Sequence, residues 1–417
     1  MKALVYQVNP AGWGLCWVLK RAWRGCLFTR LNGLRLAEVP RPELPGEEWV
    51  RVRTLLGGIC GTDLAILQQK APANSILQAY SSQPMVLGHE NVGVVEEAGS
   101  AVERSWAGRR VCVEPTLSCV VRGIEPACRS CRAGQFGACE NFGAAGEGRW
   151  GLPAGTSIGY NRVTGGSYGE YFVAHASQLV AAPEGLSDEE LVLTDPAACS
   201  LHAVLRSDWR GARQVLVYGS GAIGLTAAAG LRAVGYEGRI DLAGRGAAGA
   251  GWVKRLGVKW LALPGDAAGR FAAVAESTGG GEGRVRRSRF GNRMLDGGYD
   301  IVFECLGSRQ SINEGLKWAR ARGQVVLLGT GHGGRVDLTP LWFRELTVVG
   351  AYGRQVEDWD GRRVGTYPLV HELMRAGKLD LRGLVTHRFR LEEHRRAWAT
   401  AAAKGRRGAL KVVFDFR

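Results

Sequence analysis

The sequence has no apolar run that could cross a lipid bilayer. A membrane-spanning helix needs about 20 consecutive apolar residues, and the best candidate, Trp13 to Leu19, ends at Lys20 and Arg21. The sequence also shows no convincing secretory signal, and its ten cysteines are scattered without the spacing of a disulfide framework. We therefore expect a cytoplasmic protein with no disulfide framework and no membrane partner.

Acidic residues are few relative to basic ones. The 39 Asp and Glu residues face 54 Lys and Arg residues, which leaves a formal net charge of +15. Clustered basic residues can indicate nucleic-acid binding, because they release counterions from phosphate backbones. The densest basic run reads as a solvated surface insertion and comprises Arg284, Arg286, Arg287, Arg289 and Arg293. Because the other arginines are scattered, nucleic acid is not the expected main partner.

The length and the pattern of the chain indicate two domains. At 417 residues the chain exceeds the size at which a single hydrophobic core stops growing. The N-terminal half is rich in short β-strand patterns, whereas from about Asp195 strands alternate with helices, which predicts a parallel sheet in an α/β fold. The closing run 409–415 is a strand that could return to the first domain. We place the boundaries at 1–194, 195–350 and 351–417.

Four cysteines crowd a short segment of the N-terminal half, namely Cys119, Cys128, Cys131 and Cys139. Zinc favours four thiolate ligands in a structural site, and a CxxC pair supplies two of them from one tight turn. Disulfides or ordinary core thiols are the alternatives. Because a closed four-thiolate shell leaves no position for a substrate, we interpret the cluster as a structural zinc site that braces a lobe at about 112–142.

A glycine motif closes the predicted strand that begins at Gln214, and it begins a helix predicted over Ala222 to Ala233. It contains Gly219, Gly221, Ile223 and Gly224. In such a GxGxxG motif the first glycine permits a tight turn, the second lets backbone amides approach a pyrophosphate, and the third allows close packing of helix on sheet. The alternative is a glycine-rich turn without a ligand. The context of strand, motif and helix favours a dinucleotide-binding site.

The end of the next strand bears on the choice of nicotinamide coenzyme. An acidic residue there would bond the ribose hydroxyls of NAD and repel the 2′-phosphate of NADP. The sequence instead reads Ala243-Gly244-Arg245, which favours NADP over NAD. Asp241 lies close enough that a small error in register would restore an acid and favour NAD.

Two short motifs in the β-rich half supply side chains typical of a catalytic metal site. They are Cys60-Gly61-Thr62-Asp63 and Gly88-His89-Glu90. Catalytic zinc takes three protein ligands and keeps one open position for water or substrate. Asp195, at the predicted start of the second domain, is the candidate for a further ligand. Taken singly, each residue could instead be a core cysteine, a satisfied histidine or a helix-capping aspartate.

Taken in order, these motifs resemble those of the zinc-dependent medium-chain alcohol dehydrogenases, including their polyol, threonine and glucose dehydrogenase-like members. The resemblance covers nearly the whole chain. It rests on CGTD, GHE, the four-cysteine lobe, GSGAIG and the closing segments 377–387 and 404–414. It implies a β-rich GroES-like catalytic domain, a Rossmann coenzyme domain with a doubly wound parallel sheet, and assembly as a homodimer or homotetramer.

The resemblance also implies roles for individual residues. Cys60 and His89 would hold the catalytic zinc, and Glu90 and Asp195 would be acidic positions that exchange on and off the metal. Thr62 would relay the proton of the substrate. The implied reaction transfers hydride between NAD or NADP and a secondary alcohol, polyol or sugar-like hydroxyl, or the matching carbonyl compound.

Three features depart from the family pattern. Ala65 stands where relatives often carry the histidine of the proton relay. Asp195 stands where they commonly have cysteine or glutamate, so its shorter side chain could reach a metal only through water. Eight residues, 120–127, separate Cys119 from the CxxC pair, where many relatives have two.

Two other functions stay open at this stage. One is a zinc-free quinone or enone reductase of the same fold, against which the Cys60 and His89 motifs argue. The other is a non-catalytic nucleic-acid-binding module, which only Ala65 and the basic charge favour.

Overall fold

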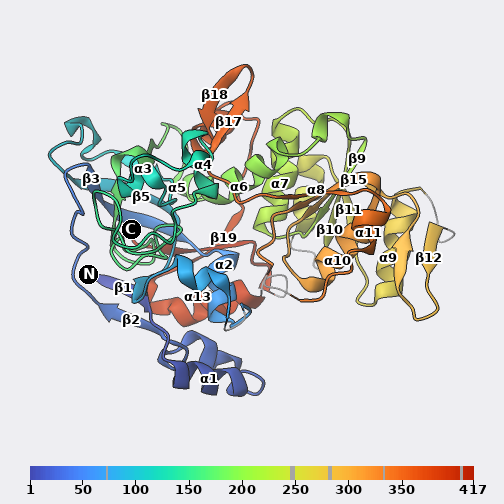
Figure 1. Cartoon of the computed structure of the whole chain (residues 1–417), viewed down its shortest axis with the longest axis horizontal. Helices are drawn as coiled ribbons and strands as arrows, with labels where there is room; N and C mark the ends of the chain where they lie inside the picture. The colour runs from blue at the N-terminus through green and yellow to red at the C-terminus, as the bar shows by residue number, and fades with distance from the viewer. Residues whose placement is uncertain (72–73, 245–248, 280–283, 332–333, 404–406) are drawn as a thin grey trace.

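The computed structural model describes the whole chain except residues 72–73, 245–248, 280–283, 332–333 and 404–406. Figure 1 shows two lobes, a β-rich lobe that holds both termini and a lobe built on a parallel sheet with helices around it. The expected α/β architecture is confirmed. Among the described residues, no helix is long and apolar enough to span a membrane.

The β-rich lobe contains a three-stranded sheet in the order β2-β1-β4 and a seven-stranded sheet in the order β19-β20-β3-β5-β6-β8, with β7 paired to β3. Apolar residues alternate along its long strands, so Val50 and Val52 of β3 enter one core with Val95 of β5. The strands are β1 (Lys2–Tyr6), β2 (Leu34–Glu38), β3 (Trp49–Gly58), β4 (Met85–Val86), β5 (Glu90–Ala98), β6 (Arg110–Val113), β7 (Tyr171–His175), β8 (Leu179–Ala181), β19 (Val385–Phe389) and β20 (Lys411–Asp415).

The last strand of the chain lies inside this sheet. β20 pairs antiparallel with β3, where Phe414 faces Gly57, and parallel with β19. The Phe414 ring packs edge-on against Tyr168 at a centroid distance of 5.1 Å. The C-terminal segment thus contributes side chains to the β-rich lobe. The domain boundaries at 194 and 350 remain predictions.

The second lobe is a six-stranded parallel sheet in the order β11-β10-β9-β14-β15-β16. This is the strand order of a doubly wound dinucleotide-binding fold. Its strands are β9 (Gln214–Tyr218), β10 (Arg239–Gly244), β11 (Lys259–Ala262), β14 (Tyr299–Glu304), β15 (Ala319–Leu327) and β16 (Thr347–Gly350).

Both faces of the parallel sheet are covered by helices. Val217 of β9 packs in one core with Leu225 of α7, whereas its neighbour Tyr218 packs in another with Phe271 of α9. Successive side chains of a strand point to opposite faces, so a strand buried on both faces reads as a continuous apolar run. The helices of this lobe are α7 (Ala222–Ala233), α8 (Ala250–Leu256), α9 (Ala267–Ser277), α10 (Arg309–Trp318) and α11 (Thr339–Phe343).

The remaining helices border the β-rich lobe or join the two lobes. They are α1 (Pro10–Leu19), α2 (Gly61–Leu67), α3 (Cys119–Arg122), α4 (Arg129–Arg132), α5 (Asp188–Leu191), α6 (Thr194–Leu205), α12 (Thr366–Arg375) and α13 (His394–Ala403). Two hairpins project from the body, β12–β13 (Val285–Arg287, Arg293–Leu295) and β17–β18 (Val356–Trp359, Arg362–Gly365). The densest basic run forms the first hairpin, so it is a surface insertion as expected.

Candidate functional site

Strand pairing brings the two short motifs of the β-rich half together. Gly58, at the end of β3, faces Glu90 at the start of β5, so the turn that carries Cys60 lies beside His89. One ligand atom each from Cys60, His89 and Glu90 falls within 4.8 Å of the others. His89 and Glu90 are buried, whereas Cys60 is partly exposed. A thiolate, an imidazole and a carboxylate at this spacing can hold a metal ion.

The surroundings of His89 are negatively charged. Asp63 Oδ1 lies 3.8 Å from Nδ1 of the imidazole, which is too far for a hydrogen bond, and Nδ1 has no hydrogen-bond partner among the described residues. Burial by itself would lower the pKa of His89, but the Cys60 thiolate and the Asp63 carboxylate together raise that pKa to about 9. The local field therefore favours a cation, either a proton or a metal ion.

Glu90 has a second charged partner that the sequence did not predict. Nζ of Lys411, on the C-terminal strand β20, forms an ion pair with Glu90 Oε2, and both side chains are almost wholly buried. The carboxylate needs room beside Gly58, where an added Cβ would lie 2.2 Å from the same oxygen. Glu90 thus belongs to the candidate ligand cluster and also pairs with a buried ammonium group, so its carboxylate has two alternative partners.

Asp195 lies outside the group of three candidate ligands. Its carboxylate accepts hydrogen bonds from Nε of Arg354 at 2.7 Å, from Nη2 at 3.4 Å and from the Tyr367 hydroxyl at 2.7 Å. Burial would raise the pKa of Asp195, but Arg354 and His89 hold it below its ordinary value. With both oxygens engaged, this geometry gives no support to Asp195 as a direct metal ligand.

A tyrosine lies next to the predicted proton-relay residue. The Tyr160 hydroxyl is 3.0 Å from Oγ1 of Thr62 and 2.7 Å from Oδ1 of Asp63. Its ring lies 5.4 Å from the His89 ring, centroid to centroid. Ala65, the departure noted in the sequence, is buried in α2. The sequence did not predict Tyr160 because a tyrosine in a glycine-rich loop carries no motif.

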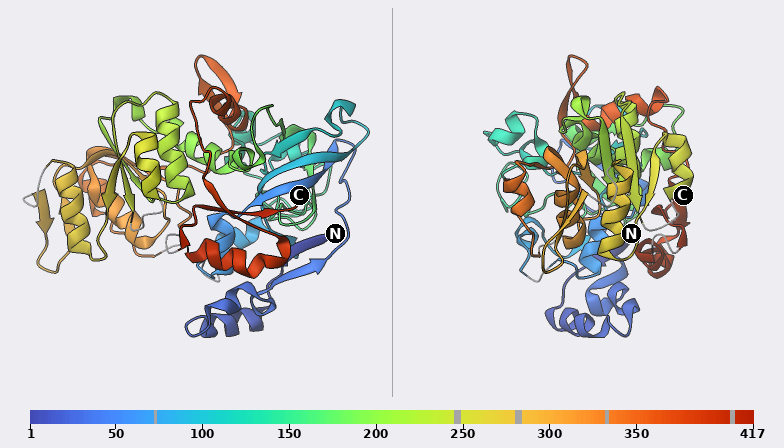
Figure 2. Two further views of the ribbon diagram at one scale, coloured as in Figure 1. Left: turned by 180° about the vertical axis from the view of Figure 1, so that it is seen from behind. Right: turned by 90° about the vertical axis from the view of Figure 1, so that its right-hand side faces the viewer.

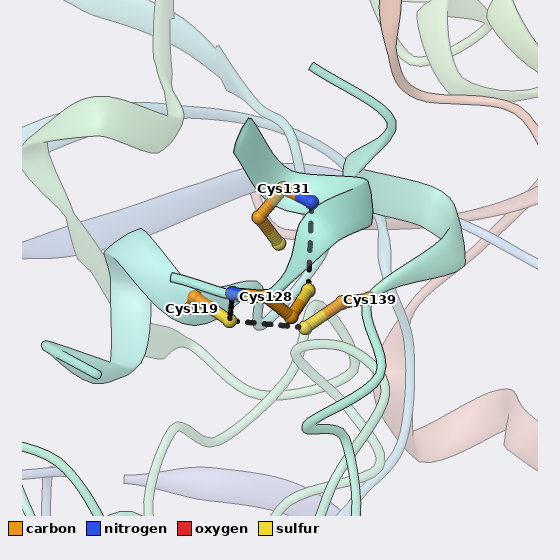
Figure 3. A group of neighbouring side chains, drawn as sticks. All are labelled: Cys119, Cys128, Cys131 and Cys139. Atoms are coloured by element: carbon orange, nitrogen blue, oxygen red, sulfur yellow. Dashed lines mark hydrogen bonds between the residues drawn. The ribbon is translucent and has the colours of Figure 1, made fainter. Parts of the chain in front are cut away.

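The four lobe cysteines converge as the sequence predicts. Their sulfur atoms lie within 4.8 Å of one another and face a common centre (Figure 3). Backbone amides donate to these sulfurs, with Cys131 N 3.4 Å from Sγ of Cys128 and Asn141 N 3.4 Å from Sγ of Cys139. A hydrogen bond from Cys131 lowers the pKa of Cys139 to about 5 and raises the pKa of Cys131, and burial raises the pKa of Cys119. Four sulfurs at this spacing, with amide donors beside them, suit a metal ion, which would bind them as thiolates.

The long first loop of this lobe closes around a buried arginine. Residues 119–122 form the short helix α3, and Gly123 ends it with a φ of 64°. Arg122 is fully buried and donates hydrogen bonds to the backbone carbonyls of Leu117, Phe142, Ala144, Leu152, Pro153 and Gly155. The longer loop therefore does not prevent closure, because one guanidinium ties it to the segments that flank it.

The glycine motif has the geometry of a dinucleotide loop. Gly219 adopts a φ of 133°, and a Cβ on Gly224 would lie 1.6 Å from the Gly219 carbonyl oxygen, so neither position accepts a side chain. Gly221 is the N-cap of α7, and a Cβ there would meet no atom within 4 Å, so the approach to the helix start is open. Ile223 lies partly buried in the first turn. Backbone amides at such a helix start suit a pyrophosphate.

The end of β10 lacks a free acid among the described residues. Gly244 ends the strand, and Arg245 lies outside the described residues. Asp241 is fully buried and accepts hydrogen bonds from Arg239, Ser277 and Tyr299. These hydrogen bonds hold the Asp241 carboxylate inside the lobe, so it is not free to bind the ribose hydroxyls of NAD.

Comparisons with known proteins agree along the chain. The family described as alcohol dehydrogenase GroES-like domain matches residues 46–184, and the family described as zinc-binding dehydrogenase matches residues 222–363. L-idonate 5-dehydrogenase of Vitis vinifera is 30% identical over 390 residues, which cover 92% of this chain and 93% of the relative. Sorbitol dehydrogenase of Arabidopsis thaliana is 29% identical, with coverage of 92% and 93%.

Solved structures share the fold. A protein of Sinorhizobium meliloti 1021, solved with NADP bound, superimposes with a TM-score of 0.68 at 26% identity and covers 92% of this chain and 96% of its own. Galactitol-1-phosphate dehydrogenase of Escherichia coli has a TM-score of 0.68 at 22% identity, with 100% of both chains covered.

Proposed function

Because the chain belongs to the zinc-dependent medium-chain alcohol dehydrogenase family, we propose that it oxidises a secondary alcohol or polyol, or reduces the matching ketone, with a nicotinamide coenzyme. The observation that carries this proposal is the cluster of Cys60, His89 and Glu90 in the β-rich lobe. A zinc-free quinone reductase has no use for such a cluster. A nucleic-acid-binding module would require neither the cluster nor the dinucleotide loop.

We propose that Cys60 and His89 hold a catalytic zinc ion. The donor set fits zinc, since it offers one sulfur and one nitrogen in an electronegative and largely buried site. When bound, the metal supplies Lewis-acid polarisation of the substrate oxygen, and the coenzyme supplies the hydride acceptor. Glu90 lies near enough to be a further ligand, with Lys411 as its alternative partner. We assign Asp195 to the charged surroundings of this site and not to the metal ligands.

We propose that Thr62 and Tyr160 move the substrate proton. In the structure the Tyr160 hydroxyl is 3.0 Å from Oγ1 of Thr62 and is placed as the donor. During turnover Oγ1 of Thr62 would accept the proton of the substrate hydroxyl and pass its own proton to the Tyr160 oxygen once the Tyr160 hydroxyl has turned toward Asp63. The proton of Tyr160 then passes to Asp63, whose carboxylate oxygen lies 2.7 Å away. This route would carry the proton from Thr62 as far as the buried Asp63 carboxylate without the histidine that Ala65 replaces.

Replacing Tyr160 by Phe is expected to lower kcat for alcohol oxidation by roughly tenfold to a hundredfold, near the lower end of what a general acid or base contributes. KM is expected to change little, because Tyr160 is assigned to proton transfer and not to binding of the substrate. Steady-state rates across pH measure both constants. Thr62→Val tests the other member of the proposed relay. In the double variant Thr62→Val/Tyr160→Phe, a loss equal to the product of the two single losses would contradict a shared relay.

We propose NADP as the preferred coenzyme, since β10 ends without a free acid and Asp241 is bound within the sheet. We expect kcat/KM for NADP to exceed kcat/KM for NAD by on the order of tenfold. This ratio corresponds to the energy of about one favourable contact with the 2′-phosphate. The measurement is a coenzyme-reduction screen over alcohols, polyols and sugars with both coenzymes in parallel. A preference for NAD would contradict this assignment, and no reduction with any alcohol would contradict the proposed function itself.

The remaining assignments follow the family resemblance. We propose a structural zinc ion on the four lobe cysteines, which makes two zinc ions per chain. We also propose domains at 1–194, 195–350 and 351–417, and a homodimer or homotetramer. The departure at residues 120–127 does not argue against the lobe site, because its sulfurs converge despite the longer loop.

A further inference from the structure

A helical insertion between β1 and β2 presents an apolar surface with no partner among the described residues. Helix α1 carries no charged residue along its ten positions, and only Cys16 of it is buried. A helix that is apolar on all sides is normally buried in a core or in lipid. Figures 1 and 2 show this helix projecting from the body in every view.

The insertion is held firmly on its inner side. Asn9 caps the helix by accepting hydrogen bonds from the amides of Ala11 and Gly12. Sγ of Cys16 lies 2.9 Å from Sγ of Cys26 in the following turn, and Nε2 of Gln69 donates to the Trp13 carbonyl at 2.9 Å. The outward face is therefore a built surface, since its inner contacts fix the orientation of the helix.

Large apolar side chains dominate the outward face. The exposed fractions are 52% for Leu15, 49% for Trp17, 62% for Val18 and 54% for Trp23. These four residues together with Lys20, Arg21 and Arg24 form the insertion face. Burying so many apolar groups would be favourable, and an uncovered patch of this kind marks an interaction site.

Basic residues surround the apolar ones. Lys20 Nζ lies 5.7 Å from the centre of the Trp17 ring, and Arg21 and Arg24 are exposed. Within the described chain none of these three makes an ion pair with an acidic side chain. All charged residues that precede Glu38 are basic, namely Lys2, Lys20, Arg21, Arg24, Arg30 and Arg35. The partner of this face should therefore be negatively charged as well as apolar.

We propose that the insertion face docks the protein on an anionic phospholipid surface. Tryptophan and basic side chains around a short apolar helix suit the boundary between headgroups and acyl chains. A ten-residue helix is about 15 Å long, so it would lie in that boundary and could not span the bilayer. This changes the expectation of no membrane partner, which rested only on the lack of a spanning segment.

Other occupants fit the face less well. Two copies that met through it would bring Lys20, Arg21 and Arg24 close to their own equivalents, and like charges repel. Nucleic acid offers phosphates for the arginines but leaves Leu15 and Val18 without an apolar partner. A lipid surface supplies phosphate and acyl chains at the same depth.

The test is co-sedimentation of the full-length protein with vesicles of phosphatidylcholine alone or mixed with phosphatidylglycerol. Binding is expected only to the mixed vesicles and is expected to weaken with added salt. Trp17→Ser/Trp23→Ser and Arg21→Glu/Arg24→Glu are each expected to lower the partition coefficient by at least about tenfold. Because these side chains are exposed, both variants are expected to retain coenzyme binding, which reports that they are folded.

Matched controls come from the hairpin β12–β13, which is also basic and carries an exposed phenylalanine. Arg287→Glu/Arg289→Glu and Phe290→Ser are expected to leave vesicle binding unchanged. Three results would overturn the proposal. They are no binding to the mixed vesicles at low salt, an equal loss in the hairpin variants, and self-association or DNA binding that the insertion-face variants abolish while vesicle binding persists.

Discussion

Replacing Cys60 by Ala is expected to abolish alcohol-dependent coenzyme reduction, with a loss of at least about a thousandfold. Lewis-acid stabilisation by a catalytic metal amounts to several kcal/mol, and about 4 kcal/mol corresponds to a thousandfold in rate. Removing one of the two assigned ligands should also lower the zinc content by one ion per chain. Rate measurements and metal analysis of the same preparation report both effects.

Coenzyme binding is expected to survive the Cys60→Ala change, because the loop at Gly219 to Gly224 belongs to the other lobe. A second cysteine separates the two assigned zinc ions. Cys119→Ala should remove the lobe metal and lower the free energy of unfolding, since structural zinc contributes to folding directly. The matched control is Cys16→Ala, a buried thiol of the N-terminal insertion, which should keep both metal ions. If Cys60→Ala retained turnover, that result would contradict the proposed catalytic zinc site.

Replacing Arg354 by Ala is expected to lower the free energy of unfolding by about 3–5 kcal/mol, which is the usual cost of breaking a buried ion pair from one side. Arg354 and Asp195 are each only 4% exposed, with Nε and Oδ1 2.7 Å apart. The truncation leaves the Asp195 carboxylate buried, with the Tyr367 hydroxyl and the weakly donating Cys199 thiol as its donors. Urea unfolding followed by circular dichroism measures the change.

A double variant separates the contribution of the ion pair to the free energy of unfolding from the cost of leaving one buried charge unpaired. Arg354→Leu/Asp195→Asn removes both charges and is expected to recover most of the stability that Arg354→Ala loses. The exposed pair Arg362–Glu372 in the same C-terminal segment is the control. Arg362→Ala is expected to cost only a small fraction as much, because solvent screens an exposed pair. Equal losses for Arg354→Ala and Arg362→Ala would show that burial of the first pair has no energetic consequence.

Periodic local patterns predicted much of the fold. The helix expected over Ala222–Ala233 has those bounds, and the strand expected at Gln214 forms β9. Alternation of apolar strands with helices is a local property of the chain, so it can be read directly. Helix α1 was missed because its side chains are apolar all round, and without a polar face the helical period leaves no trace.

The candidate site was predicted in part. Cys60, His89 and Glu90 lie in motifs with recognisable spacing, and the structure brings them together. The partners that decide their behaviour carry no motif. Lys411, which pairs with Glu90, comes from the C-terminal strand, so nothing near Glu90 in the sequence indicates it.

The sequence by itself determined many of the strands, the glycine motif of the coenzyme loop and the short motifs that supply the candidate metal ligands, because each of these is a pattern of residues close together along the chain. Only the tertiary structure decided that Arg354 forms an ion pair with Asp195, that Tyr160 lies beside Thr62, and that the apolar side chains of the insertion face are exposed. Asp195 and Arg354 are 159 residues apart. The physical reason is that such contacts arise from the pairing of distant strands and helices, which no local pattern specifies.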